Sequence, residues 1–148
     1  MPNDARPTCE FDSDALLLKL DVTVAADIEA ISPVVERVME LVDEMKCAEG
    51  KHFEIETALR EALANAIIHG AGNDASKLIE LCVACDIERG MLIVVRDPGP
   101  GFDPANISNP VFGQNVYSEH GRGIFLINQL MDEVKFERGG TEIHMRKR

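Results

Sequence analysis

The sequence predicts an α/β (α+β) two-layer sandwich, in which a mixed, largely antiparallel sheet is covered on one face by helices. Three observations predict this class: a segment with strand-type alternation, two segments with apolar residues at helical spacing, and two apparent hairpins. Strands both before and after the helices favour this arrangement over a doubly wound parallel sheet. A chain of 148 residues is predicted to form one domain over residues 1–148, with residues 1–13 flexible.

The first predicted strand covers residues 16–24, where LLLKLDVTV alternates apolar and polar side chains. A helix follows, because Ser32 and Pro33 are the residue types found at a helix N-cap and first helical position. The residues before Ser32 are expected to add a preceding turn. Apolar side chains then repeat at helical spacing, at Val34, Val38, Leu41 and Met45.

A second helix is predicted over residues 52–69, ended by Gly70 and Gly72. Two strands follow at about 77–87 and 91–96, and the tight turn between them makes a hairpin. The residues of the second helix that we expect in the core are Ile55, Leu59, Ala62, Leu63 and Ala66.

The stretch after the second hairpin strand, DPGPGFDPANISNPVFGQNVYSEHGRG, is rich in Gly, Pro, Asn and Ser and has no sustained periodicity. A loop of this length inside a domain is usually functional or disordered. Residues 124–131 then predict a short helix with one apolar face. Strands at 134–138 and 141–147 close the chain, and the two-residue connection Gly139-Gly140 predicts a hairpin.

Charge and hydropathy exclude several classes of protein. The formal net charge of −11, from 15 Lys and Arg against 26 Asp and Glu, argues against a nucleic-acid binder, since the only basic cluster is the tail at 146–148. The N-terminal stretch lacks the apolar core of a signal peptide, and no apolar run is long enough to span a bilayer. We therefore expect a cytoplasmic location without membrane contact.

Four cysteines do not form a dense framework, so reduced thiols are expected. The C-x-x-C pair of Cys82 and Cys85 falls in a predicted strand, where residues three apart point to opposite faces. No second ligand pair accompanies it, and zinc typically needs four ligands. Core packing is the interpretation that we favour over a metal or redox site.

The first candidate site pair, Glu61 and Asn65, lies in the second predicted helix. Residues four apart on a helix lie one above the other, so a carboxylate and an amide oxygen address one small volume. Magnesium favours such oxygen ligands, and a carboxylate near a substrate hydroxyl can act as a general base. An exposed polar helix face gives the same pattern, so the pair alone leaves both interpretations open.

Two glycine motifs follow the pair. In DPGPG, Gly99 and Gly101 permit close backbone approaches, and Asp97 at the strand end could accept a hydrogen bond from a ligand amino group. In HGRGIFLI, Gly121 and Gly123 precede an apolar helix whose free N–H groups and partial positive charge suit a phosphate. Arg122 adds a cationic clamp. A Pro-Gly turn and a flexible helix cap are the alternatives for the two motifs, and neither a P-loop nor a Rossmann fingerprint occurs.

The order of these motifs resembles the GHKL (Bergerat) ATP-binding fold: E-x-x-x-N on a helix, D-x-G-x-G after a strand, a long loop, G-x-G at a helix start, and G-G-T. The resemblance covers about residues 54–148. Within that superfamily, EALANAIIHG, VVRDPGPGFDP and GRGIFLINQLMDEVKFE followed by GGTEIHMRKR look most like the anti-sigma factor serine kinases of the RsbW type.

The resemblance implies ATP and Mg²⁺ as cofactors. Asn65 would bind the metal between the ATP phosphates, and Glu61 would act as base toward a protein hydroxyl. Asp97 would read the adenine amino group, with Gly99 and Gly101 admitting the base and ribose. His69 also fits the family pattern, with no role that the residues themselves define.

The remaining implied residues surround the phosphates and the base. An ATP lid would cover residues 103–120, and Thr141 would support the adenine pocket. The phosphates would lie at the start of the following helix, at Gly121, Arg122 and Gly123.

The family implies a protein serine/threonine kinase that sequesters a sigma factor and phosphorylates a small anti-sigma factor antagonist, commonly as a homodimer. A second possibility is an ATP-binding regulatory interaction module without phosphoryl transfer. A third, a detached histidine-kinase catalytic domain, is disfavoured because no histidine lies on a separate dimerisation helix pair. Glu61 favours the kinase, since nucleotide binding alone depends more on Asn65 and Asp97.

Overall fold

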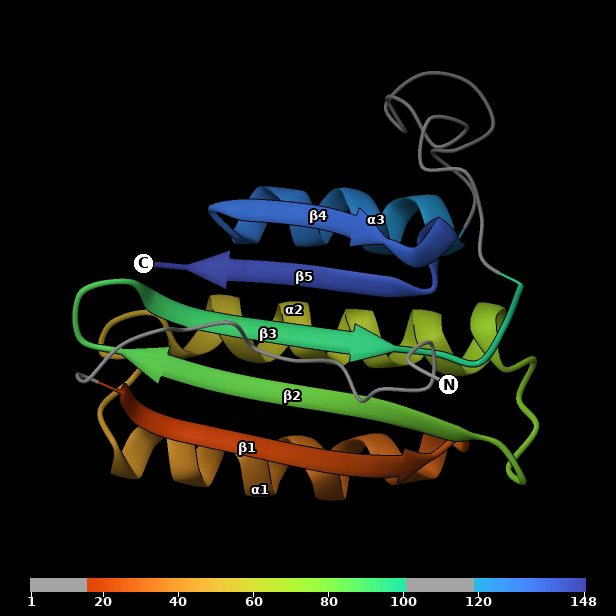
Figure 1. The fold of residues 1–148 in the computed structure, drawn as a ribbon, viewed down its shortest axis with the longest axis horizontal. Helices are drawn as coiled ribbons and strands as arrows, with labels where there is room; N and C mark the ends of the chain where they lie inside the picture. The colour runs from red at the N-terminus through yellow and green to blue at the C-terminus, as the bar shows by residue number, and fades with distance from the viewer. Residues whose placement is uncertain (1–15, 101–118) are drawn as a thin grey trace.

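The computed structural model describes residues 16–100 and 119–148 and confirms the two-layer α/β prediction (Figure 1). Five strands form one sheet in the order β1-β2-β3-β5-β4, and all four described pairings are antiparallel. Of the helices in these two ranges, none has the length and apolar run that a bilayer crossing needs. In chain order the elements are β1 (Leu16–Ala25), α1 (Ile31–Glu44), α2 (His52–Asn65), β2 (Leu78–Asp86), β3 (Gly90–Arg96), α3 (Glu119–Leu130), β4 (Glu133–Glu137) and β5 (Glu142–Lys147).

The core lies between one face of the sheet and the three helices, which lie together behind the sheet in Figure 1. Helix α2 contacts both α1 and α3 and lies in the middle of the helical layer. Its side chains Leu59 and Leu63 are fully buried, and burying one leucine contributes roughly 1.5–3 kcal/mol. Successive strand residues face opposite sides, so Val83 and Ile93, which are register partners in β2 and β3, also face the core.

Helix α1 begins one residue earlier than Ser32, so the prediction of Ser32 as its N-cap is wrong. The cap residue is Ala30, and a 3-10 turn over Ile28–Ala30 supplies the expected preceding turn. Asp27 caps that turn by accepting a hydrogen bond from the backbone N–H of Glu29 at 3.0 Å. The hydroxyl of Ser32 instead accepts from Arg60 of α2 at 3.1 Å, so it links two helices rather than closing one end.

The connection between β4 and β5 is longer than the predicted two-residue glycine turn. Glu137 pairs with Glu142, which leaves residues 138–141 in the connection. Three successive residues there, Arg138, Gly139 and Gly140, have positive φ values of 54°, 68° and 90°. The Thr141 hydroxyl donates to the Arg138 carbonyl at 2.8 Å, so this turn is closed by its own side chain.

Cys47 and Cys85 form a disulfide, which contradicts the expectation of reduced thiols at these two positions. The fold places the loop after α1 beside the end of β2, with a Cα–Cα distance of 6.0 Å, although 38 residues separate the cysteines. Cys82 packs on the opposite face of the sheet with Ala84, as the strand geometry predicts, but it is disulfide-bonded too, so the expectation of a reduced thiol is also wrong at this position. No group of three or more metal-binding side chains occurs within residues 16–100 and 119–148.

Loss of this disulfide should destabilise the protein. A bond closing a loop of 38 residues restricts the unfolded chain, and this effect is worth about 2–4 kcal/mol. We expect Cys47→Ser to lower the free energy of unfolding by that amount relative to the oxidised wild type, measured by urea denaturation without reductant. Peptide mapping should recover Cys47 joined to Cys85; equal stability of the two proteins, or free thiols at both positions, would contradict the assignment.

Candidate functional site

The site begins on α2, where Glu61 and Asn65 lie one turn apart and are both half-buried. Within the described residues neither side chain has a hydrogen-bond partner, so the carboxylate and the amide are available to a ligand. The helix continues beyond Asn65 as a π-helical turn over Ala66–Gly70, closed by a hydrogen bond from Ala71 N to the Ala66 carbonyl at 2.8 Å. Such widened turns are frequent at functional sites.

Gly123 lies directly against the Glu61 and Asn65 side chains. A Cβ added to Gly123 would stand 3.0 Å from Glu61 Oε2 and 3.1 Å from Asn65 Nδ2. Helix α3 begins at Glu119, so Gly121 and Gly123 lie in its first turns rather than before it, which differs from the prediction. The start of α3 nevertheless lies against the predicted pair of Glu61 and Asn65. The first backbone N–H groups of a helix have no hydrogen-bond partner within that helix.

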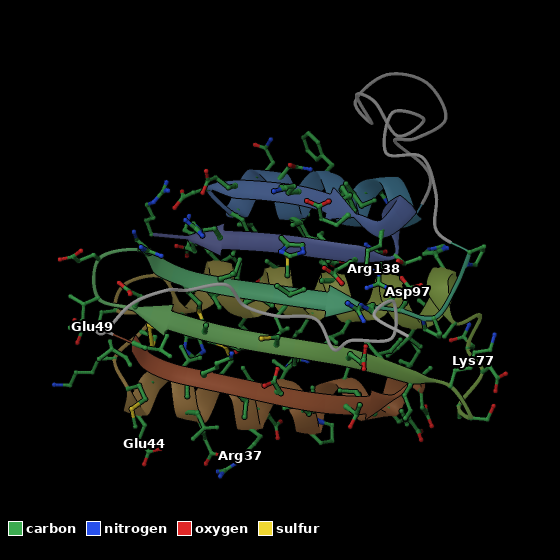
Figure 2. The ribbon with its side chains drawn as sticks, in the orientation of Figure 1. Arg37, Glu44, Glu49, Lys77, Asp97 and Arg138 are labelled. Atoms are coloured by element: carbon green, nitrogen blue, oxygen red, sulfur yellow. A yellow bond between two sulfur atoms is a disulfide. The ribbon has the colours of Figure 1, made fainter. Side chains whose placement is uncertain are left out.

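Asp97 directly follows the last residue of β3 and lies at the end of that strand (Figure 2). Its carboxylate Oδ1 accepts from the Gly99 N–H at 2.8 Å, and its own N–H donates to the Thr141 carbonyl at 2.9 Å. Burial raises the pKa of Asp97, and the hydrogen bond from Gly99 opposes that shift. The side chain is thus a partly desolvated acceptor with a fixed orientation.

Gly70 holds Asp97 in place, a role that the sequence did not reveal. A Cβ on Gly70 would overlap the Asp97 carboxyl, and a Cβ on Gly99 would overlap the Gly70 carbonyl. The end of the widened helical turn therefore packs backbone to backbone against the Asp97–Gly99 segment. We predicted Gly70 only as the stop of the helix, because nothing local in the sequence indicates this tertiary contact.

Two neighbouring hollows lie around these residues. A cavity of about 220 Å³, which we call the base cavity, has mostly apolar walls and one carboxylate. A second hollow of about 240 Å³, the phosphate hollow, lies toward α3, and Asn65 and His69 line both. The base cavity is lined by Ala62, Asn65, Ala66, His69, Gly70, Val95, Asp97, Ile124, Phe136, Gly140, Thr141 and Ile143. The phosphate hollow is lined by Glu61, Ala64, Asn65, Ile68, His69, Arg122, Gly123 and Leu126.

The structure thus brings most of the predicted residues together: Asp97 and Thr141 at the base cavity, Arg122 and Gly123 at the phosphate hollow, and Asn65 at both. Gly101 and lid residues 103–118 lie outside the described residues. Glu119 and His120, the last residues of the predicted lid, belong instead to the first turn of α3.

The prediction missed the apolar walls of the base cavity. Phe136 and Ile143 are register partners in β4 and β5, and both pack against the core. Strand alternation could have placed them on the core face of the sheet. It could not show that the core opens there into a cavity beside Asp97.

The donor set fits a magnesium nucleotide. A carboxylate at the end of an apolar cavity accepts from an exocyclic amino group, and the apolar walls suit a flat base. The Asn65 amide oxygen is one hard ligand at the junction of the hollows. Mg²⁺ commonly takes only one or two protein ligands and completes its shell with substrate phosphates and waters. Arg122 beside the α3 N-terminus suits an anion.

Fold and site together define a nucleotide-binding domain of the ATPase class. The chain belongs to the histidine kinase-like ATPase domain family, whose family model matches residues 24–147. It is 34% identical over 134 residues to an anti-sigma F factor of Geobacillus thermodenitrificans, covering 85% of this chain and 80% of that protein. It is also 29% identical over 133 residues to an anti-sigma F factor of Clostridium novyi, covering 86% and 82% of the two chains. Family membership makes ATP the expected nucleotide.

Gly123→Ala should separate nucleotide affinity from stability. Alanine is favoured over glycine in a helix by up to about 1 kcal/mol, which offsets the cost of shifting the Glu61 and Asn65 side chain ends, so thermal stability should change little. The added methyl group would crowd Glu61 and Asn65 and should weaken Mg-ATP binding on the order of tenfold. Calorimetric titration and thermal unfolding measure the two effects, with Gln129→Ala on the exposed side of α3 as the control. Unchanged ATP affinity in Gly123→Ala would show that this close contact is not part of the site.

Asp97→Asn should change how stability depends on pH. The folded-state pKa of Asp97 lies above the ordinary value of 3.8. Below the unfolded-state pKa the carboxyl is protonated in both states, so its ionisation does not lower the free energy of unfolding. The cost grows as the pH rises to the folded-state pKa and is constant above it. Asparagine removes the charge and keeps an acceptor for Gly99 N–H, so the variant should gain stability relative to wild type at pH 7.

This gain should narrow as the pH falls toward 4, measured by urea denaturation at both pH values. Asp21→Asn, an exposed substitution on β1, gives the baseline for losing one carboxylate. A gain that is the same at both pH values would contradict a raised pKa at Asp97.

Proposed function

We propose that the protein is an ATP-dependent serine/threonine protein kinase that also acts as an anti-sigma factor. The observation that carries this proposal is the position of the Glu61 carboxylate, which lines the phosphate hollow beside Asn65 but does not line the base cavity. Nucleotide binding alone does not require a carboxylate beside the phosphates, because the negative carboxylate repels the negative phosphates. A carboxylate at this position can act as the general base that accepts the proton of an incoming hydroxyl, and we assign this role to Glu61.

In the proposed reaction, a serine or threonine hydroxyl oxygen of the acceptor protein bonds to the terminal phosphorus of ATP, and the bond from that phosphorus to ADP breaks. Glu61 takes the hydroxyl proton. Arg122 and the α3 N-terminus offset the negative charge on the phosphoryl oxygens, which is the main demand of phosphoryl transfer. No covalent intermediate on this chain is needed.

Magnesium would be held by Asn65 together with the nucleotide phosphates, and when bound it would neutralise phosphate charge and align the two reacting oxygens. Asp97 would accept from the adenine amino group, with Thr141 beside it. Gly99 and Gly101 would admit the base and ribose, and Gly121 and Gly123 would keep the phosphate side open.

The name of the similar proteins, anti-sigma F factor, supports the partners that we propose. We infer that this chain binds a sigma factor and holds it inactive, and that the phosphate acceptor is a small anti-sigma factor antagonist. We also expect a homodimer and a cytoplasmic location. The net charge of −11 agrees with protein partners rather than direct contact with nucleic acid.

The test begins with capture of partners on the tagged protein in the presence of Mg-ATP, identified by mass spectrometry. We expect a sigma factor and a small serine- or threonine-bearing protein. Transfer of labelled phosphate from ATP to that small protein is then measured with Glu61→Gln, which should bind ATP as the wild type does and transfer 10²–10⁴-fold more slowly, the usual contribution of a general base. Glu54→Gln, in the first turn of the same helix, is the matched control.

Each result decides one part of the proposal. Equal transfer by wild type and Glu61→Gln would remove Glu61 as the base. ATP binding without any transfer would favour the regulatory module without kinase activity. Capture of neither a sigma factor nor a small acceptor would overturn the anti-sigma role and leave the ATP site.

A further inference from the structure

A cluster of charged side chains lies on the sheet face opposite the helices, at the end of the sheet next to the base cavity. Arg96 of β3 pairs in register with Glu80 of β2 and Glu142 of β5. Its Nε donates to Glu142 Oε2 at 2.7 Å, and a terminal guanidinium nitrogen donates to Glu80 Oε2 at 3.4 Å. His144 Nε2 lies 2.7 Å from Glu142 Oε1. One guanidinium thus connects three strands.

These groups are more enclosed than ordinary surface ion pairs. The side chains of Arg96 and Glu142 are only 13% and 9% exposed. Burial by itself would raise the pKa of Glu142, but the hydrogen bonds from Arg96 and His144 lower it overall, so the carboxylate stays ionised at neutral pH. Charge-assisted hydrogen bonds of this kind are stronger than neutral ones. Exposed ion pairs, by comparison, contribute little.

The cluster is one residue away from the nucleotide site along both strands. Arg96 and Glu142 form the last registered pair of β3 and β5, and the next residues outward are Asp97 and Thr141. Their backbones share the hydrogen bond from Asp97 N to Thr141 O at 2.9 Å. Both next residues line the base cavity, whereas Arg96, Glu80 and Glu142 do not.

The neighbours of the cluster show which face of the sheet it occupies. Val95 and Ile143 face the core, so the adjoining Arg96 and Glu142 point to the other side of the sheet. Strand ends open more readily than strand centres. An opening at this end would separate Asp97 from Thr141. It would also displace the Asp97 carboxylate, which is the acceptor proposed for the adenine amino group. Ion pairs across β2, β3 and β5 oppose that opening.

We propose that Arg96, bridging Glu80 and Glu142, is a positioning residue for adenine recognition: it holds Asp97 and Thr141 in register from the opposite face of the sheet without touching the nucleotide. The proposal rests on nucleotide binding at the base cavity and is independent of phosphoryl transfer. Its signature is base selectivity. Guanine has a carbonyl where adenine has its amino group, so a correctly held Asp97 favours ATP over GTP.

The test measures dissociation constants for Mg-ATP and Mg-GTP by calorimetric titration of the full chain. Arg96→Ala should weaken ATP binding on the order of tenfold and reduce the ATP-to-GTP preference by a similar factor, as expected for a displaced binding group. Arg96→Lys keeps the charge but loses the two-sided geometry of the guanidinium. Arg96→Lys should therefore lose less ATP affinity and less of the ATP-to-GTP preference than Arg96→Ala. It provides the test if the alanine variant does not fold.

Arg146→Ala is the matched control, because Arg146 forms an ion pair with Glu133 in the same sheet but away from the base cavity. It should leave both nucleotide affinities unchanged. A fall in thermal stability with the ATP-to-GTP preference unaltered in both Arg96 variants would overturn the positioning role and leave a purely structural cluster. Absence of ATP binding by the wild type would overturn the nucleotide site together with this proposal.

Discussion

The burial of α2 is the constraint on which the site depends. The side chains of Ile55, Leu59 and Leu63 are at most 1% exposed between the other helices and the sheet, so the helix can neither rotate nor slide without opening the core. That packing fixes the direction of the polar stripe that contains Glu61 and Asn65. The positions of both side chains are therefore set by apolar residues on the opposite side of the same helix.

Close backbone contacts convert this fixed helix into a site. Gly70 meets the Asp97 carboxyl, and Gly123 meets the Glu61 and Asn65 side chains, at separations where a Cβ would collide or crowd. Three segments that are far apart in the chain are brought together by these contacts: the end of α2, the end of β3 and the start of α3. The base cavity and the phosphate hollow consequently share Asn65 and His69 in their lining.

Local patterns in the sequence predicted the elements of the fold and the i, i+4 pair, since helical spacing alone places Glu61 above Asn65. Ordered motifs then indicated Asp97 and Gly123. The contacts that depend on tertiary packing were beyond such patterns. Ser32 has the side chain of an N-cap, but Arg60 approaches it from α2 and the helix starts earlier. Cys47 and Cys85 are separated by 38 residues, and only the packing of the loop on the sheet brings them together.

Several features of the site are unfavourable for folding taken alone. Asn65 is a weak helix former, Gly123 lies in a helix where alanine would be favoured, and burial disfavours the charge of Asp97. The core-facing residues of β2 and β3, by comparison, are apolar side chains suited to strands. Proteins accept local violations of this kind mainly where a ligand needs them. Their occurrence together around two neighbouring hollows is physical support for a binding site that is independent of any similarity in sequence.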